Sequence, residues 1–371
     1  MRIAIDARPL SYQLAGIGVY LKHVLDEIQK IDVWNHYYLI SNAFIDYELI
    51  NPKWRKIEGR LDKKLLSTLW MQCLAPLITR KLKIDVFWGP RHHLPLFLPF
   101  SMGTVLTVHD LVYRFYPETM ALPNLLVERL LLRRSVQRAH VVITDTRSTA
   151  ADITAEFQTA PEKVRPIYLG TPRLPKTANH RSEVGFSLPS RFFLFVGTLD
   201  PRKNFRRILQ AFRLLDPVRH NVHLVIAGGA GWKNKDVLEW MGGSEMRSHI
   251  HVRGYVPLDL LAFYYERALG LVFPSLYEGF GFPILEAMSC GTPVITSNVS
   301  CLKEVAGDAA LLIDPLDIPG LTAAMKQVLT DKLLRERLRV KGYKRIGEFS
   351  WSGCAEQTLE VLRTVGRQKS I

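Results

Sequence analysis

The chain has 371 residues, of which 47% are hydrophobic and 23% are charged, and its formal net charge is +14. This composition excludes intrinsic disorder, and the length exceeds one ordinary hydrophobic core, so we expect two or three domains. No stretch of about 18 apolar residues lacks a charge, so we expect no transmembrane helix.

Four cysteines lie far apart and lack the spacing of metal ligands: Cys73, Cys290, Cys301 and Cys354. This distribution is typical of free thiols in a reducing compartment. The first ten residues, MRIAIDARPL, contain only a short apolar run interrupted by charges, which is not the pattern of a signal peptide. We therefore expect a cytoplasmic protein.

The first half of the chain alternates short apolar segments with longer helical ones. We predict strands at residues 2–6, 36–41, 85–89, 104–110 and 140–145. Helical stretches lie between them, including VYLKHVLDEIQK, which follows the glycine turn AGIG, and residues 122–139. Strands that alternate with helices predict a parallel sheet covered on both faces.

A change of pattern divides the chain near its middle. Residues 164–182 are rich in Pro, Thr, Asn and Gly, which predicts a linker. The alternation then restarts, with strands predicted at residues 192–197, 222–229, 251–256, 270–275 and 293–298. Two such runs predict an α/β protein of two doubly wound domains that face a deep cleft, with ligands outside the carboxyl ends of the strands.

The net positive charge indicates an anionic partner, and residues 53–83 carry much of this charge. This segment has nine basic and two acidic residues, a net +7, which equals the net charge of the whole of residues 1–175 (23 basic, 16 acidic). Between its basic flanks lies LLSTLWMQCLAPLI, with Trp54 and Trp70 nearby. This pattern is typical of an amphipathic element at an anionic membrane surface. A core helix with solvated basic ends explains it equally well.

Two other classes of protein are alternatives. A nucleic-acid-binding protein would concentrate its basic residues on one face, whereas here the excess is +7 in residues 1–175 and +7 in residues 176–371 (26 minus 19). A dinucleotide-dependent oxidoreductase would carry a complete glycine fingerprint after a strand, but AGIGVY has Gly16 and Gly18 without the third glycine. We therefore expect no nucleic-acid partner.

The segment LVFPSLYEGFGFPILEAMSCGTPVITSN, residues 271–298, carries the strongest chemical signal. Pro283 suits a first helical position and Gly291 a helix end, which predicts a short helix at 283–290. The N-terminus of a helix attracts anions, and Gly279 and Gly281 let the backbone approach one closely. We therefore predict a phosphate site at this turn.

Glu278 and Glu286 flank this turn and cannot themselves bind phosphate, because ionised carboxylates only accept hydrogen bonds. They are suited to sugar hydroxyl groups on either side of a diphosphate, so the pattern predicts a nucleotide sugar. Arg202 and Lys203, in VGTLDPRKNF, follow a predicted strand and supply positive charge for the diphosphate.

Four polar residues in the first half are weaker candidates. His109 and Asp110, in TVHDLVY, end a predicted strand on its carboxyl side. His92 and His93, in GPRHHLP, are further candidates for substrate contact. The segment AGGAGW, residues 227–232, follows another strand and predicts a turn.

These motifs resemble the GT4 family of retaining glycosyltransferases, which have the two-domain GT-B fold. The resemblance covers nearly the full chain and rests on MRIAIDARPL…GIGVY, TVHDL, FVGTLDPRKN, VIAGGAGW, RGYVP and FPSLYEGFGFPILEAMSCGTPVITSN. It is strongest to bacterial mannosyl- and rhamnosyltransferases of surface polysaccharides. It implies an acceptor-binding domain at residues 1–172, a donor-binding domain at 173–351, and a last helix, 352–371, that packs back on the first domain.

The resemblance also implies roles for individual residues. Glu278 would hold the donor sugar, Glu286 the ribose, and Lys203 the diphosphate. His109 would lie against the transferred sugar, with Asp110, His92 and His93 toward the acceptor. The remaining donor-binding positions are Gly16, Gly18, Tyr255, Val256, Phe280, Gly281 and Phe282. Many relatives have arginine where this chain has Thr198, so Arg202 is expected to supply that charge.

The resemblance implies transfer of a sugar with retention of configuration in surface polysaccharide or lipopolysaccharide synthesis. Mannose from GDP-mannose is the first expectation, and rhamnose or glucose from a dTDP- or UDP-sugar is the alternative. The acceptor is expected to be a polyprenyl-diphosphate-linked saccharide, although a soluble acceptor stays open. The expected donor-site residues include no paired aspartates, so no metal or other cofactor is expected. The protein would lie at the inner face of the cytoplasmic membrane, in contact through residues 53–83.

Overall fold

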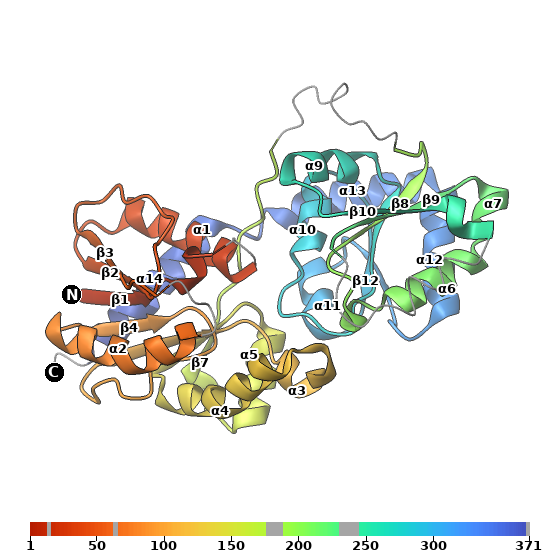
Figure 1. The fold of residues 1–371 in the computed structure, drawn as a ribbon. Helices are drawn as coiled ribbons and strands as arrows, with labels where there is room; N and C mark the ends of the chain where they lie inside the picture. Colours follow the sequence, from red (N-terminus) through yellow and green to blue (C-terminus); the bar gives the residue numbers. More distant parts are fainter. Residues whose placement is uncertain (13–15, 62–65, 176–187, 230–244, 369–371) are drawn as a thin grey trace. The chain divides into compact units, whose positions relative to one another are not determined.

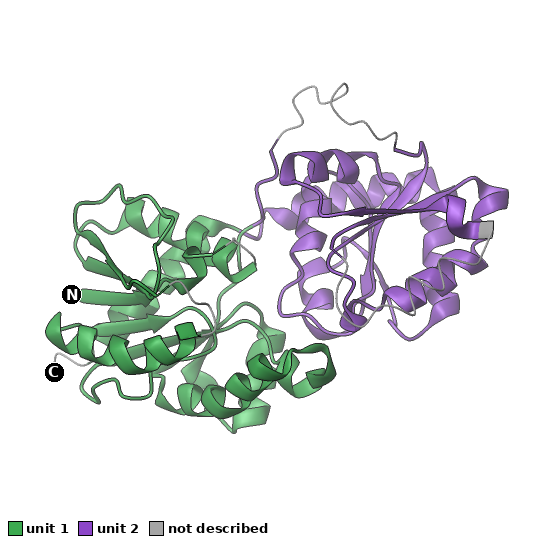
Figure 2. Cartoon of the chain, in the orientation of Figure 1, with its two compact units in different colours: residues 1–170, 350–371 green, residues 171–349 purple. Residues whose placement is uncertain are grey.

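The structure is a computed structural model that describes residues 1–12, 16–61, 66–175, 188–229 and 245–368. The chain forms two compact units (Figure 2). Unit 1 comprises Met1–Gly170 together with Ser350–Ile371, and unit 2 comprises Thr171–Phe349. The sequence-based boundaries lie at residues 172 and 352. The last helix, α14 (Trp351–Arg367), belongs to unit 1, where it packs on α1 and on strands of the sheet (Figure 1).

Unit 1 is a seven-stranded parallel sheet in the order β3-β2-β1-β4-β5-β6-β7. Its strands are β1 (Arg2–Asp6), β2 (His36–Ser41), β3 (Trp54–Glu58), β4 (Val86–Gly89), β5 (Gly103–Val108), β6 (Val141–Thr144) and β7 (Val164–Pro166). Its helices, besides α14, are α1 (Gly16–Ile31), α2 (Ser67–Lys81), α3 (Val112–Phe115), α4 (Leu122–Arg138) and α5 (Arg147–Phe157). Central strands such as β4 and β5 are buried along their whole length, as expected for a parallel sheet with two covered faces.

Unit 2 is a six-stranded parallel sheet in the order β10-β9-β8-β11-β12-β13. Its strands are β8 (Phe192–Val196), β9 (His223–Ala227), β10 (Ile250–Gly254), β11 (Gly270–Phe273), β12 (Val294–Ser297) and β13 (Leu311–Ile313). Its helices are α6 (Phe205–Leu214), α7 (Pro217–His220), α9 (Leu258–Arg267), α10 (Phe282–Ser289), α11 (Ser300–Ala306), α12 (Ile318–Thr330) and α13 (Lys332–Ile346). The predicted helix at 283–290 is confirmed within one residue at each end.

Both sheets reverse their strand order at one point. Counted from the first strand of each unit, both orders begin 3-2-1-4-5-6, so the reversal lies between β1 and β4 in unit 1 and between β8 and β11 in unit 2. At such a point the two following loops diverge to opposite faces of the sheet and leave room for a ligand at the carboxyl ends of the strands. This topology fixes where a site is expected in each unit.

Two local predictions are wrong, whereas the membrane contact of residues 53–83 stays a prediction. The AGIG segment is not a turn before a helix, because α1 begins at Gly16 and includes Gly18. The expected linker at 164–182 begins with strand β7, and its residues 176–182 lie outside the described residues. The amphipathic segment 53–83 contains the edge strand β3, and Trp54 is 4% exposed and stacked on Tyr37. The turn predicted at 227–232 extends beyond the described residues.

Among the described residues, none of the helices is long and apolar enough to cross a membrane.

Two glycines bring the carboxyl ends of β8 and β9 together. Gly197 and Gly228 both have a positive φ, at +137° and +155°. A Cβ atom on Gly228 would lie 2.0 Å from the carbonyl oxygen of Gly197, a backbone atom that cannot move aside without displacing β8. These glycines therefore set the spacing of the two loops beside the switch point of unit 2.

We expect Gly228→Ala to lower the free energy of unfolding of unit 2 by at least about 2 kcal/mol, because the added methyl group overlaps backbone. The matched control is Gly229→Ala, whose Cβ would meet nothing within 4 Å. Urea denaturation followed by circular dichroism measures both. Equal stability of the two variants would contradict the close approach of the strands.

Candidate active site

At the switch point of unit 2, Glu278 lies between two cations. Nζ of Lys203 is 2.5 Å from Oε1 of Glu278, and Nη1 of Arg202 is 2.7 Å from Oε2. Arg202 also donates to the carbonyl oxygen of Tyr277 at 2.6 Å. Lys203 and Arg202 follow β8, whereas Glu278 follows β11, so the ion pairs join the two loops that diverge at the reversal. We refer to these three residues as the glutamate triad.

The glutamate triad keeps Glu278 ionised. Burial raises the pKa of its carboxyl, but the Lys203 ammonium and the Arg202 guanidinium outweigh burial and hold that pKa below its usual range. The side chains of Glu278, Arg202 and Lys203 are only 10%, 16% and 14% exposed, so water screens these pairs weakly. One negative and two positive charges leave the triad with an excess of one positive charge, which favours an anionic ligand.

A short turn after β8 presents the two cations. Residues Pro201–Lys203 form one 3-10 turn, and the Asp200 side chain accepts a hydrogen bond from the Arg202 backbone N–H. Asn204 ends the turn with φ +61°, and its Nδ2 donates to the carbonyl oxygens of Pro274 and Pro315. Asn204 is buried and was missed from the sequence. It fastens the cation-bearing turn to the loops after β11 and β13.

The predicted anion site is the N-terminus of α10. Gly281, with φ +97°, is the N-cap and offers no side chain to the helical amides, and a Cβ there would meet Leu302 at 2.9 Å. The first residues of α11 hold the loop that precedes α10. Ser300 Oγ donates to the carbonyl oxygen of Glu278, and Cys301 Sγ donates to the carbonyl oxygens of Glu278 and Phe280. Gly281 and Phe280 are thus fixed in a conformation that leaves the helix end without a side-chain cap.

Glu286 lies on α10, one helix turn beyond its start. Its Oε2 accepts a hydrogen bond from the hydroxyl group of Tyr265 at 2.7 Å. Burial raises the pKa of Glu286, against the lowering effects of Tyr265 and Lys203. Lys203 thus lowers the pKa of both glutamates. The structure therefore brings together the two acids and the two cations that the sequence predicted.

Other predicted donor residues lie at the same edge of the sheet but outside the triad. Thr198 follows β8 and is exposed, and Phe282 begins α10. Tyr255 and Val256 follow β10, two strands from β8, and Tyr255 is 74% exposed. Arg202, the expected substitute for an arginine at position 198, has its Nη1 engaged by Glu278 and Tyr277.

In unit 1, His109 follows β5 and is buried. Its Nδ1 lies 2.7 Å from Oδ2 of Asp145, and its Nε2 lies 2.9 Å from the carbonyl oxygen of Pro90. An imidazolium, with an N–H on each nitrogen, satisfies both acceptors. A role of His109 in proton transfer would therefore require that one of these contacts break.

His92 and His93 share one carboxylate. Glu128, on α4, lies 3.2 Å from Nδ1 of His92 and 3.2 Å from Nε2 of His93. The backbone N–H of His109 donates to Nε2 of His92 at 3.1 Å, which assigns a lone pair to that nitrogen. Burial raises the pKa of Glu128, but the two histidines outweigh it and lower that pKa. His92 is thus built into one network with His109, whereas Asp110 accepts from the Val112 N–H and starts α3.

The switch point of unit 1 also holds an ion pair that the sequence did not reveal. Arg8 contacts Asp6 through Nε at 2.8 Å and through Nη2 at 2.6 Å, and both side chains are almost fully buried. Burial raises the pKa of Asp6, but Arg8 outweighs it and lowers that pKa. Asp6 is the last residue of β1 and Asp145 directly follows β6, so both acids lie at the carboxyl end of a strand, and that shared pattern could have marked them. Gly16 and Gly18 lie in the first turn of α1.

Comparison with known proteins shows to which family the chain belongs. Residues 176–345 match the family described as Glycosyl transferases group 1. The chain is also 30% identical to the O-antigen chain mannosyltransferase B of Escherichia coli, over 98% of this chain and 100% of that protein. The chain belongs to the group 1 glycosyltransferase family. The glutamate triad therefore lies in the part of the chain that the family match covers.

Two solved structures show the same fold. Sucrose-phosphate synthase from Thermosynechococcus elongatus has a TM-score of 0.77 at 20% identity and covers 98% of both chains. WaaG, a glycosyltransferase involved in lipopolysaccharide biosynthesis, has a TM-score of 0.70 at 18% identity and covers 98% of this chain and 99% of its own. At these identities the likeness concerns the fold. It confirms the expected GT-B fold of two Rossmann-like domains.

We predict that substitutions of the two glutamates have opposite effects on the free energy of unfolding. The pKa of Glu278 is lowered in the folded state, so its contribution is present above its ordinary pKa near 4.5 and is lost as the pH falls through the lowered value. The pKa of Glu286 is raised, so its ionisation at neutral pH works against folding. We expect Glu278→Gln to cost about 3 kcal/mol at pH 7, because two cations lose their partner, whereas Glu286→Gln is neutral or stabilising.

Urea denaturation at pH 7 and at a series of pH values below 4.5 tests this, because the gap between wild type and Glu278→Gln should shrink as the pH falls through the lowered pKa of Glu278. Glu336→Gln serves as the control, since that carboxylate forms a solvent-exposed pair with Arg339 and its loss should leave stability unchanged. A deficit of Glu278→Gln that persists at low pH would argue against the ion pairs as its cause.

Proposed function

We propose that the protein transfers mannose from GDP-mannose to a lipid-linked saccharide, with retention of configuration, in the synthesis of a surface polysaccharide. The observation that carries this proposal is the glutamate triad beside the uncapped start of α10. The choice of mannose and of a surface polysaccharide follows the name of the full-length relative, an O-antigen chain mannosyltransferase. Rhamnosyl or glucosyl transfer from a dTDP- or UDP-sugar is the alternative.

The donor would use each part of the site differently. The diphosphate accepts hydrogen bonds from the first amides of α10 and from Lys203, whose ammonium contacts Glu278. Glu278, held by two cations, accepts from hydroxyl groups of the sugar. Glu286 accepts from the ribose through Oε1, because its Oε2 already accepts from Tyr265. Tyr255 and Val256 cover the base.

Bond cleavage places negative charge on the departing diphosphate. Lys203, Arg202 and the helix amides are fixed before the reaction, so they stabilise that charge without reorganisation. The departing phosphate oxygen can then accept the proton of the incoming hydroxyl group on the same face of the sugar, which retains the configuration. This scheme needs no metal ion, since the protein supplies the charge that a metal would otherwise provide.

The acceptor is assigned to unit 1. His92 and His93 lie at the carboxyl edge of its sheet beside His109 and Asp110, and the buried network around Glu128 and Asp145 holds them rigidly. The lipid part of the acceptor implies peripheral contact with an anionic membrane, to which residues 53–83 contribute. Because Trp54 is buried, α2 is the part of that segment available for the contact.

A panel of nucleoside diphosphates tests the donor. We expect GDP to raise the melting temperature more than UDP, dTDP or ADP, because a ligand at 100 times its Kd stabilises by about 2.7 kcal/mol. Lys203→Ala should abolish the shift, whereas Lys332→Ala, which removes an exposed cation of α13, should leave it intact. A larger shift with dTDP or UDP would favour the alternative sugar, and no shift with any nucleotide would refute a nucleotide-sugar site.

Transfer from GDP-mannose to a synthetic mannosyl acceptor with a diphosphate lipid tail tests the chemistry. We expect the product to keep the anomeric configuration of the donor, as measured by NMR, and the rate to be unchanged by EDTA. An inverted product would refute the same-face scheme. Loss of the rate in EDTA and its recovery with Mn²⁺ would show that a metal ion, and not Lys203 and Arg202, carries the leaving-group charge.

A further inference from the structure

Three segments of unit 1 form one continuous face. They are α2 with its extension to Lys83, the loop Leu94–Met102, and α4. Gln72 Oε1 accepts the Leu96 N–H at 2.8 Å, and Ser135 Oγ accepts the Leu94 N–H at 2.9 Å. These bonds fix the loop to α2 on one side and to α4 on the other. We call this face the helix–loop–helix surface; Figure 1 shows α2 and α4 on one side of the unit 1 sheet.

The inner side of this layer packs on the sheet. Met71 and Ala75 of α2, Leu98 of the loop, and Leu132 and Val136 of α4 all belong to one buried core cluster. The surface is therefore part of the folded unit and not an appendage that folds on binding. Its outward side chains are held in place by the core beneath them.

The outer side is unusually apolar for a surface. Its large exposed side chains, with their exposed fractions, are Leu69 (61%), Leu77 (58%), Phe97 (69%), Phe100 (86%), Leu126 (56%) and Leu130 (63%). Leu126 and Leu130 are four residues apart on α4 and so share one stripe of the helix. Large exposed apolar side chains gathered on neighbouring segments are typical of an interaction site.

The charges of this surface have one sign. The three segments contain seven basic residues, Arg80, Lys81, Lys83, Arg129, Arg133, Arg134 and Arg138, and one acidic residue, Glu128. Glu128 faces inward to His92 and His93, so it does not offset the basic residues at the surface. A protein partner would commonly be met by both signs of charge, whereas anionic lipid offers only the complementary one.

We propose that the helix–loop–helix surface binds an anionic phospholipid bilayer, with Phe97, Phe100 and the leucines of α2 and α4 inserted among the lipids. Apolar side chains supply burial and the surrounding arginines and lysines supply attraction to the headgroups. The inference rests on the proposed membrane contact and relocates it. It adds the loop and α4, which the basic segment 53–83 does not include, and it leaves out β3.

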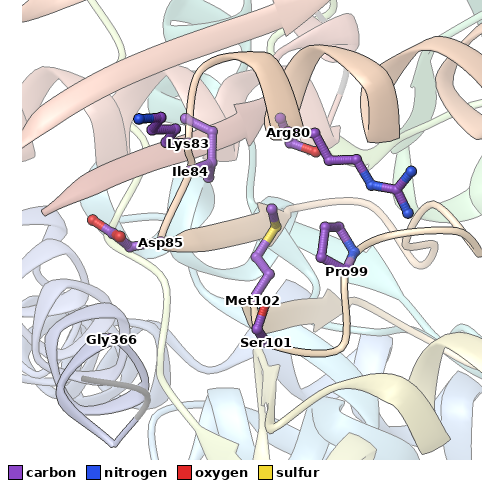
Figure 3. Close-up of a pocket in the computed structure, with 9 residues that line it drawn as sticks. Arg80, Lys83, Ile84, Asp85, Pro99, Ser101, Met102 and Gly366 are labelled. Carbon is purple, nitrogen blue, oxygen red and sulfur yellow. The ribbon is translucent and has the colours of Figure 1, made fainter. Parts of the chain in front are cut away.

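A pocket with two basic residues lies beside the surface. It has a volume of about 450 Å³ and lies between the end of α2 and the loop, at the amino ends of β4 and β5 (Figure 3). Arg80 and Lys83 line it, as do Pro99 and Ser101. Its one carboxylate, Asp85, accepts the backbone N–H of Arg2 at 2.7 Å. Two basic residues thus line this cavity, with their side chains directed to different sides of it in Figure 3.

This arrangement leaves the catalytic edge of unit 1 open. The pocket lies at the amino ends of the strands, whereas His92, His93 and His109 follow their carboxyl ends. Membrane contact through the helix–loop–helix surface therefore does not cover the residues proposed to meet the acceptor. Glu128 and Leu126 lie on opposite sides of α4, so one helix carries a residue of each surface.

Co-sedimentation with phosphatidylcholine vesicles, with and without phosphatidylglycerol, tests the proposal on the full chain. We expect binding only to the anionic vesicles, weakened by salt. Phe97→Ser with Phe100→Ser, Leu126→Ser with Leu130→Ser, and Arg80→Gln with Lys83→Gln should each lower the partition coefficient about tenfold. The control is Leu333→Ser with Val340→Ser on α13, which removes equally exposed apolar side chains from unit 2 and should not change binding.

The shift of melting temperature by GDP is measured on every variant and should stay at its wild-type value, so failure of the donor assignment is distinguished from failure of this one. Equal binding to neutral and anionic vesicles, or unchanged binding by the phenylalanine and leucine variants, would overturn the proposal. Sedimentation equilibrium provides the other decisive result. If the phenylalanine variant converts a dimer to a monomer without affecting vesicle binding, the face is an interface between copies of the chain.

Discussion

The contact between Glu278 and the two cations after β8 is the constraint on which unit 2 depends. Parallel strands linked by right-handed crossovers send the chain after β8 and after β11 to opposite faces of the sheet. The two loops meet at one backbone hydrogen bond, from the Leu276 N–H to the carbonyl oxygen of Arg202 at 2.9 Å. The glutamate triad also joins them through side chains, and the Asn204 side chain donates a hydrogen bond to the carbonyl oxygen of Pro274 in the loop after β11. A buried ion cluster of this kind is costly to desolvate and contributes specificity of position more than stability. The cost is understandable if the same charges later meet a ligand.

The two units solve the same topological problem with different degrees of openness. In unit 1 the switch point is closed by the bidentate pair of Asp6 and Arg8, whose side chains are 0% and 2% exposed. In unit 2 the equivalent place holds a carboxylate with an excess of cationic charge and a helix end without a side-chain cap. In unit 1 the charges of Asp6 and Arg8 neutralise each other. In unit 2 the glutamate triad keeps one excess positive charge, which can attract an anion. The shared topology of the two units therefore does not imply that they share the same kind of site.

Much of this site could be predicted because its signals are local. Pro283 and Gly291 bound a helix, Gly281 needs its positive φ, and the cations directly follow a strand, so α10 and the glutamate triad were within reach of sequence reasoning. The misses depend on distant contacts. The AGIG sequence alone does not indicate that α1 begins at Gly16. The sequence around Trp54 suggests an interfacial side chain, and only the structure shows that Tyr37, in the neighbouring strand, stacks on it. Asp145 lies 36 residues from His109, and only the sheet brings them together.

The hydrogen bonds of His109 bear on how unit 1 takes part in the reaction. A general base needs a nitrogen that is free to accept a proton, whereas both ring nitrogens of His109 face oxygen atoms of the protein. His92 and Glu128 extend this network and make it rigid. Such a network suits the binding and orientation of a substrate better than proton transfer. A mechanism in which the departing diphosphate accepts the proton asks for no base in unit 1. In the proposed function, the His109 network of unit 1 therefore orients the acceptor, whereas the glutamate triad of unit 2 binds the diphosphate.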